Sequence, residues 1–121
     1  MRFSRERAGA VAIRAVGGGE ILIGDSAYAA PVAITGDRVL GAWAATPIAE
    51  LTAGHFHELI ALAPQLIILG TGPVPEFPPR DLVFALARIS IGFEVMDSAA
   101  AARTFNVLAG EGRKVAAVLY P

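Results

Sequence analysis

The chain contains no cysteine among its 121 residues. Disulfide bonds, thiolate nucleophiles, zinc–thiolate sites and iron–sulfur clusters are therefore excluded, because each needs cysteine sulfur. Small secreted domains often depend on disulfides for stability, so a cysteine-free chain of this length indicates the reducing cytoplasm. The first residues show no apolar core of a secretory signal peptide, which supports the same expectation.

Charged residues are also scarce, at 17% of the chain, and the net charge is −1. Nucleic-acid-binding domains usually carry a basic stripe, so we expect no nucleic-acid partner. Four arginines gather near the start of the chain: Arg2, Arg5, Arg7 and Arg14. Glu6 interrupts this group, which is more typical of a solvated terminus than of a binding stripe.

Apolar residues are abundant, at 55% of the chain, against about 45–50% in ordinary soluble proteins. A chain this short buries only roughly two thirds of its surface, so part of this apolar content must face outward. Exposed apolar patches usually mark interaction sites, which predicts a protein partner or a homo-oligomer. The longest uncharged run, residues 59–75, is interrupted by prolines and glycines. It therefore predicts no transmembrane span.

The first third of the chain has the pattern of β-strands. Four strands are predicted there: residues 10–16, 20–23, 28–34 and 38–43. The three glycines Gly17–Gly19 predict a three-residue hairpin turn between the first two strands. Pro31 places part of the third strand at an edge or a bulge, because proline cannot donate to a ladder. These strands predict an antiparallel meander.

The rest of the chain alternates between helical and strand patterns. Helices are predicted to begin near His55, Pro79 and Ser98, and strands are predicted near Leu66, Phe93 and Val115. The helical spacing of apolar residues predicts two buried faces: Phe56, Leu59, Ile60 and Ala63 on the first helix, and Leu82, Leu86 and Ile89 on the second. The continuous apolar run Leu66–Leu69 is typical of a strand buried on both faces.

Such alternation predicts an α/β fold with crossover connections. We expect one domain over residues 1–121, in three layers and with about three helices. Its central sheet should be mixed and largely parallel, with an antiparallel β layer formed by the N-terminal strands.

Common catalytic and cofactor motifs do not fit the sequence. The glycine segment Gly17–Gly24 is followed by Asp25, where a phosphate-binding loop would need lysine, so a hairpin is favoured. His55 and His57 stand two residues apart, so they do not share a helix face, and no further histidine completes a metal site. With no nucleophile elbow either, we predict no catalytic residue, no metal and no cofactor.

One group of residues suggests a ligand site at the ends of neighbouring strands. Its members are Gly70, Thr71, Gly72, Ser98, Arg103 and Asn106. Ligands collect at the carboxyl ends of parallel strands, where glycines permit close approach and a helix start offers free N–H groups. The planar guanidinium of Arg103 suits a small anion. The alternative is structural: glycines in turns, Asn106 bonded to backbone and Arg103 paired with a carboxylate.

Three segments carry a family resemblance: Leu66–Gly72, Gly92–Leu108 and Glu111–Ala117. In order and spacing they resemble the small-domain family that includes mitochondrial respiratory complex I assembly factor 3 and the adipogenesis-associated domain protein. Ser98 stands where that family commonly has threonine. The resemblance implies a three-layer α/β fold with a mixed sheet and no settled enzyme activity. It also implies a non-enzymatic binding or assembly factor, with a small enzyme or anion-binding protein as the alternative.

Overall fold

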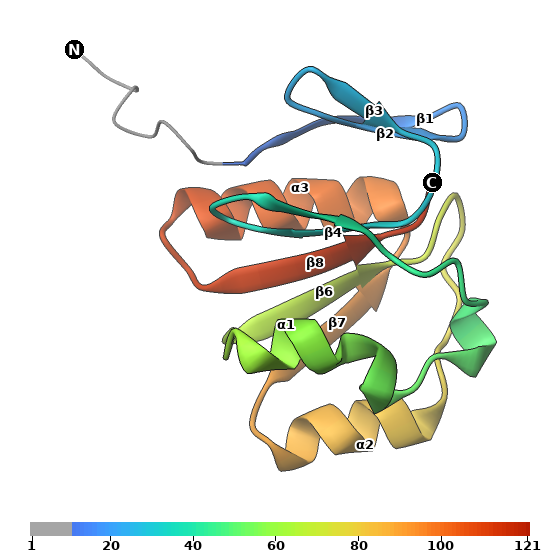
Figure 1. Cartoon of the computed structure of the whole chain (residues 1–121), viewed down its shortest axis with the longest axis vertical. Helices are drawn as coiled ribbons and strands as arrows, with labels where there is room; N and C mark the ends of the chain where they lie inside the picture. Colours follow the sequence, from blue (N-terminus) through green and yellow to red (C-terminus); the bar gives the residue numbers. More distant parts are fainter. Residues whose placement is uncertain (1–10) are drawn as a thin grey trace.

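The computed structural model describes residues 11–121, which form two β-sheets and the helices that cover them (Figure 1). The small sheet has the order β1-β2-β3 and the central sheet the order β5-β4-β8-β6-β7. The strands are β1 (Ile13–Gly17), β2 (Glu20–Ile23), β3 (Ser26–Tyr28), β4 (Val32–Thr35), β5 (Val39–Ala42), β6 (Leu66–Gly70), β7 (Gly92–Met96) and β8 (Val115–Leu119). The helices are α1 (His57–Ala61), α2 (Arg80–Arg88) and α3 (Ser98–Gly110), with 3-10 turns η2 (Ile48–Glu50) and η3 (Ala53–Phe56).

The predicted fold class is confirmed, with a mixed central sheet and an antiparallel N-terminal layer. Strand β6 runs parallel to both β7 and β8, while β4 runs antiparallel to β5 and β8. The run Leu66–Leu69 forms the strand buried on both faces that was expected, and Ile67, Ile68 and Leu69 are fully buried. Residue 10 of the first predicted strand, and Arg2, Arg5 and Arg7, lie outside the described residues.

The hairpin turn between β1 and β2 is shorter than predicted. Gly17 pairs with Glu20, so only Gly18 and Gly19 form the turn. Both have positive φ, +61° and +79°. A two-residue turn of this kind matches the right-handed twist of the strands and requires positive φ at both positions, which glycine adopts without strain.

The single strand predicted over residues 28–34 is wrong. The chain leaves the small sheet after Tyr28, and it enters the central sheet at Val32, with Pro31 between the two strands. Because proline has no N–H to donate, it fits a crossing between sheets better than a place inside either ladder. Strands β4 and β5 therefore extend the central sheet instead of continuing the N-terminal meander.

The two faces of the central sheet carry separate apolar clusters. Helix α3 and the small sheet cover one face, and η2, η3, α1 and α2 cover the other (Figure 1). Side chains alternate along a strand, so neighbouring residues of β8 enter different clusters: Val115, Ala117 and Leu119 face α3, and Ala116 and Val118 face α2.

Two residues predicted to lie on buried helix faces are exposed. Ile89 is 50% exposed, because α2 ends at Arg88 and Ile89 already has non-helical backbone angles. Ala63 is exposed as well, at a left-handed φ of 52° that lies beyond the end of α1. The helical spacing of apolar residues in the sequence therefore continues beyond the residues at which α1 and α2 end.

Candidate functional site

Four of the six predicted site residues meet where β6 ends and α3 begins. The N–H of Gly72 donates to Ser98 Oγ at 2.8 Å, and the N–H of Ser98 donates to the Gly72 carbonyl at 2.9 Å. The Ser98 hydroxyl in turn donates to the Tyr120 carbonyl at 2.6 Å. Parallel strands bring these segments together at one edge of the sheet, as the sequence predicted.

This cluster is closely packed. Ser98 is fully buried, and its hydroxyl both accepts and donates a hydrogen bond within the protein. A Cβ atom added to Gly70 would lie 2.8 Å from both Leu119 Cδ2 and Ser98 Oγ. Gly70 is therefore required where helix and strand approach most closely, and Ser98 ties the start of α3 to the ends of β6 and β8.

Thr71 fixes the loop that leaves this cluster. Thr71 is buried, and its hydroxyl donates to the Val74 carbonyl at 2.7 Å and accepts from the Glu76 N–H at 3.1 Å. The loop contains four prolines, Pro73, Pro75, Pro78 and Pro79. Prolines restrict the backbone, so Thr71 and the prolines together hold this exposed segment in one conformation.

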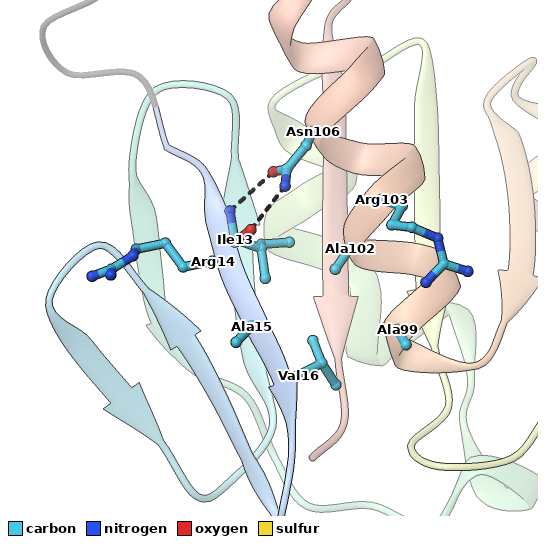
Figure 2. A pocket seen from close by; sticks show the side chains of 8 residues that line it. All are labelled: Ile13, Arg14, Ala15, Val16, Ala99, Ala102, Arg103 and Asn106. Atoms are coloured by element: carbon cyan, nitrogen blue, oxygen red, sulfur yellow. Dashed lines mark hydrogen bonds between the residues drawn. The ribbon is translucent and has the colours of Figure 1, made fainter.

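Arg103 and Asn106 lie elsewhere, one turn apart on α3: Figure 2 shows Asn106 pointing toward β1 and Arg103 extending away from it. Asn106 binds both backbone groups of Ile13: its Oδ1 accepts from the Ile13 N–H at 2.9 Å, and its Nδ2 donates to the Ile13 carbonyl at 2.8 Å. The side-chain amide thereby supplies the acceptor and the donor that a neighbouring strand would otherwise provide for Ile13. Asn106 joins the small sheet to α3.

A pocket of about 220 Å³ lies beside this contact. It is lined by Ile13, Arg14, Ala15, Val16, Ala99, Ala102, Arg103 and Asn106. Figure 2 shows the two arginine side chains extending away from the pocket in opposite directions. Arg14 donates to the Gly24 carbonyl and lies 3.6 Å from Asp25, whereas Arg103 is exposed and has no partner among residues 11–121. The predicted anion site is thus divided between two places, and anion binding at either stays a prediction.

The structure also shows a group of exposed apolar side chains that the sequence analysis did not locate. Five of the six exposed large hydrophobic side chains among the described residues lie in one segment: Val74, Phe77, Val83, Phe84 and Ile89. We call these five the apolar surface. The signal in the sequence was the run Leu82-Val83-Phe84, because three adjacent apolar residues cannot all face the core from one helix.

Neither histidine lies in a metal site within residues 11–121, where no group of three or more ligand side chains occurs. His55 is half-buried, and its Nδ1 accepts from the Thr52 N–H at 3.0 Å. It completes the cap of η3, whereas His57 is exposed. In the same part of the chain, no helix is long and apolar enough to cross a membrane.

Comparisons with known proteins give consistent matches. The model of a family described as protein of unknown function (DUF498/DUF598) matches residues 13–120. A Bordetella parapertussis crystal structure is 30% identical, with a TM-score of 0.85 over 93% of this chain and 97% of that one.

Two curated relatives are similar over part of their length. Human NADH dehydrogenase (ubiquinone) 1 alpha subcomplex assembly factor 3 is 32% identical over 100 residues, which cover 73% of this chain and 54% of the relative. A Francisella tularensis protein named 13 kDa major membrane protein is 28% identical over 72 residues, which cover 60% of this chain and 58% of the relative. The chain thus spans little more than half the length of these two relatives.

Proposed function

The chain belongs to the family of proteins of unknown function DUF498/DUF598, and from this premise we propose that it is a non-enzymatic protein-binding domain with an assembly-factor-like role. The similarity to a human protein named as an assembly factor supports this proposal. The partner is another protein or a second copy of this chain. We place this activity in the cytoplasm, which the cysteine-free composition supports.

The apolar surface is the observation that carries the proposal. Phe77 is 86% exposed and Phe84 is 55% exposed. Covering aromatic side chains of this size stabilises a complex strongly, because each Å² of apolar area removed from water contributes about 25 cal/mol of free energy. Such a concentration of exposed aromatic and aliphatic residues in one segment is typical of an interaction site.

The anchoring of the loop adds to this argument. Val74 and Phe77 belong to the segment that Thr71 and the four prolines hold in place. Binding costs less conformational entropy when the contact residues are already ordered in the free protein. The buried hydroxyl of Thr71 therefore contributes to binding through the shape of the loop, without touching the partner.

Site-specific photo-crosslinking in cells tests the proposal. A photo-reactive amino acid at Phe77 should give a discrete crosslinked product, and Phe84→Ser on the same chain should reduce its yield severalfold. The matched control carries the photo-reactive group at Val107, which is 58% exposed but lies on α3, outside the apolar surface. Equal products at both positions, or no effect of Phe84→Ser, would contradict the proposal.

Solution mass distinguishes the two kinds of partner. If the partner is a second copy, sedimentation of the pure protein will show a dimer that Phe77→Ser and Phe84→Ser together convert to monomer. If the partner is another protein, the pure chain will sediment as a monomer. Both substitutions replace exposed residues, so the free energy of unfolding should change by less than about 0.5 kcal/mol each.

A further inference from the structure

Strand β7 forms one edge of the central sheet, with β6 as its only neighbour among the described strands. The N–H of Gly92 donates to the Gln65 carbonyl, and the Met96 carbonyl accepts from the Thr71 N–H, so both residues point their backbone groups toward β6. Backbone groups alternate in direction along a strand. The N–H and carbonyl groups of Phe93 and Val95 therefore point away from the sheet, and no described residue binds them.

This edge is open and regular. No residue of β7 is buried, whereas every residue of β8 and four of the five in β6 are buried. The register between β6 and β7 runs without a bulge. The opposite edge, β5, is distorted by a register shift and by Gly41 at a φ of +117°. A straight, unpaired strand is a template for an additional strand, while bulges prevent such pairing.

The side chains of β7 determine which strand can be added. Phe93 and Val95 are half-buried and pack into the cluster beneath α2, and Glu94 projects from the other face and is exposed. Four backbone groups are free: the N–H and the carbonyl of Phe93 and of Val95. A second copy of β7 that binds all four would pair antiparallel, with Phe93 opposite Val95 and Glu94 opposite Glu94. Like charges directly opposite each other destabilise a strand pair. The edge therefore disfavours a second copy and favours a strand that brings a cation to Glu94.

We propose that β7 binds an extended segment of a partner protein, in which apolar residues alternate with lysine or arginine. The partner strand forms backbone hydrogen bonds with Phe93 and Val95, and its basic side chain pairs with Glu94. Its apolar side chains continue the cluster beneath α2. This inference rests on the proposed protein-binding function and adds to it the conformation and charge of the bound segment.

Amide hydrogen exchange measured by NMR tests the proposal on the whole chain. The probes are two blocked synthetic peptides, TVKVKVT and its acidic counterpart TVEVEVT. At a concentration about ten times its Kd, TVKVKVT should slow exchange of the Phe93 and Val95 amides about tenfold, because only the unbound fraction exchanges freely. TVEVEVT should leave both rates unchanged.

Variants of β7 supply the controls. Glu94→Lys should reverse the preference, so that TVEVEVT protects the two amides and TVKVKVT does not. Val95→Pro removes an outward N–H and no bond to β6, so it should abolish binding, whereas Val95→Ala, which keeps that N–H, should bind. Equal protection by both peptides, protection by neither, or an unchanged preference in Glu94→Lys would overturn the proposal.

The outcomes separate this inference from the broader function. If crosslinking at Phe77 succeeds and the peptides fail, the edge-strand proposal is wrong and the apolar surface stands. If the peptides protect β7 in the Phe77→Ser, Phe84→Ser double variant while crosslinking at Phe77 fails, the edge strand stands and the apolar-surface proposal is wrong.

Discussion

Gly70 shows how a single missing side chain permits the contact between β6 and α3. Its neighbours are Leu119 Cδ2 and Ser98 Oγ, both 2.8 Å from where a Cβ atom would lie, and Ala101 Cβ at 3.0 Å. Because Ser98 and Leu119 are fully buried, neither can move away without disturbing its own contacts. Packed interiors resist even one added carbon atom.

Gly70→Ala should therefore lower the free energy of unfolding by about 1–3 kcal/mol, the usual cost of overpacking. Urea denaturation followed by circular dichroism measures this change. Gly110→Ala is the matched control, because an added Cβ atom there meets nothing within 4 Å and alanine favours the helix. A loss of stability as large in Gly110→Ala as in Gly70→Ala would show that packing against Ser98 and Leu119 is not the cause.

Tyr120 makes the free energy of unfolding depend on pH in the alkaline range. Burial raises the pKa of its phenol above the usual 10.0, and the hydroxyl donates to the Thr46 carbonyl at 2.6 Å. The unfolded chain therefore ionises at a lower pH than the folded one. This contribution to stability is complete below pH 10 and is lost as the pH rises through the folded-state pKa.

We expect the free energy of unfolding to fall more steeply above pH 10 in the wild type than in Tyr120→Phe. Urea titrations at a series of pH values from neutral to alkaline measure both slopes. Below pH 10 the variant should be less stable by about 0.5–1.5 kcal/mol, because it loses one hydrogen bond. Parallel curves across the whole range would contradict the assignment to Tyr120.

At the scale of elements, the contact between α3 and β1 depends on one side chain. Asn106 satisfies both backbone groups of Ile13, at the outer edge of the small sheet. Without this amide, the N–H and carbonyl of Ile13 lose both of these hydrogen bonds. The attachment of the small sheet then relies on the apolar contacts of Ile13, Ile21 and Ile23.

Asn106→Leu should lower the free energy of unfolding by about 1–3 kcal/mol, for two lost hydrogen bonds. Amide exchange should accelerate in β1 and β2 and change little in β6 and β8, which NMR can resolve residue by residue. Arg103→Ala, one turn earlier on the same helix, removes an exposed side chain and should leave both sets of rates unchanged. Uniform acceleration over all strands would instead indicate that the two sheets unfold together.

The elements were predictable to different degrees. Residues 66–119 follow short-range rules: a glycine-bounded apolar run, a proline before a helix and Asp97, whose carboxylate caps α3, each mark a boundary locally. The crossing at Pro31 was not predictable in this way, because the change of sheet depends on pairing between β4 and β8, which lies far away in the sequence. Likewise, the proximity of Gly72 and Ser98 follows from parallel strand order, but the partner of Asn106 is distant in sequence and leaves no local signal.

On the scale of the whole molecule, the closely packed residues and the exposed apolar residues of the described chain lie in different places. The small sheet and α2 lie at opposite ends of the view in Figure 1, with the central sheet and α3 between them. The predicted site residues Gly70, Gly72 and Ser98 lie in the packed middle, and the apolar surface lies on α2 and the loops that flank it. Substitutions in the apolar surface can therefore test the proposed interaction without disturbing the packed middle.

The position of β8 also matters while the protein is being synthesised. Among the described strands it comes latest in the sequence, yet it is the central one of its sheet, where it joins β4 on one side to β6 on the other. As the chain emerges from the ribosome, β4–β5 and β6–β7 must wait as separate pairs with their inner edges unpaired. Only when Val115–Leu119 has emerged can the two pairs join, so nascent chains that stall before this strand are the form most exposed to chaperones and to aggregation.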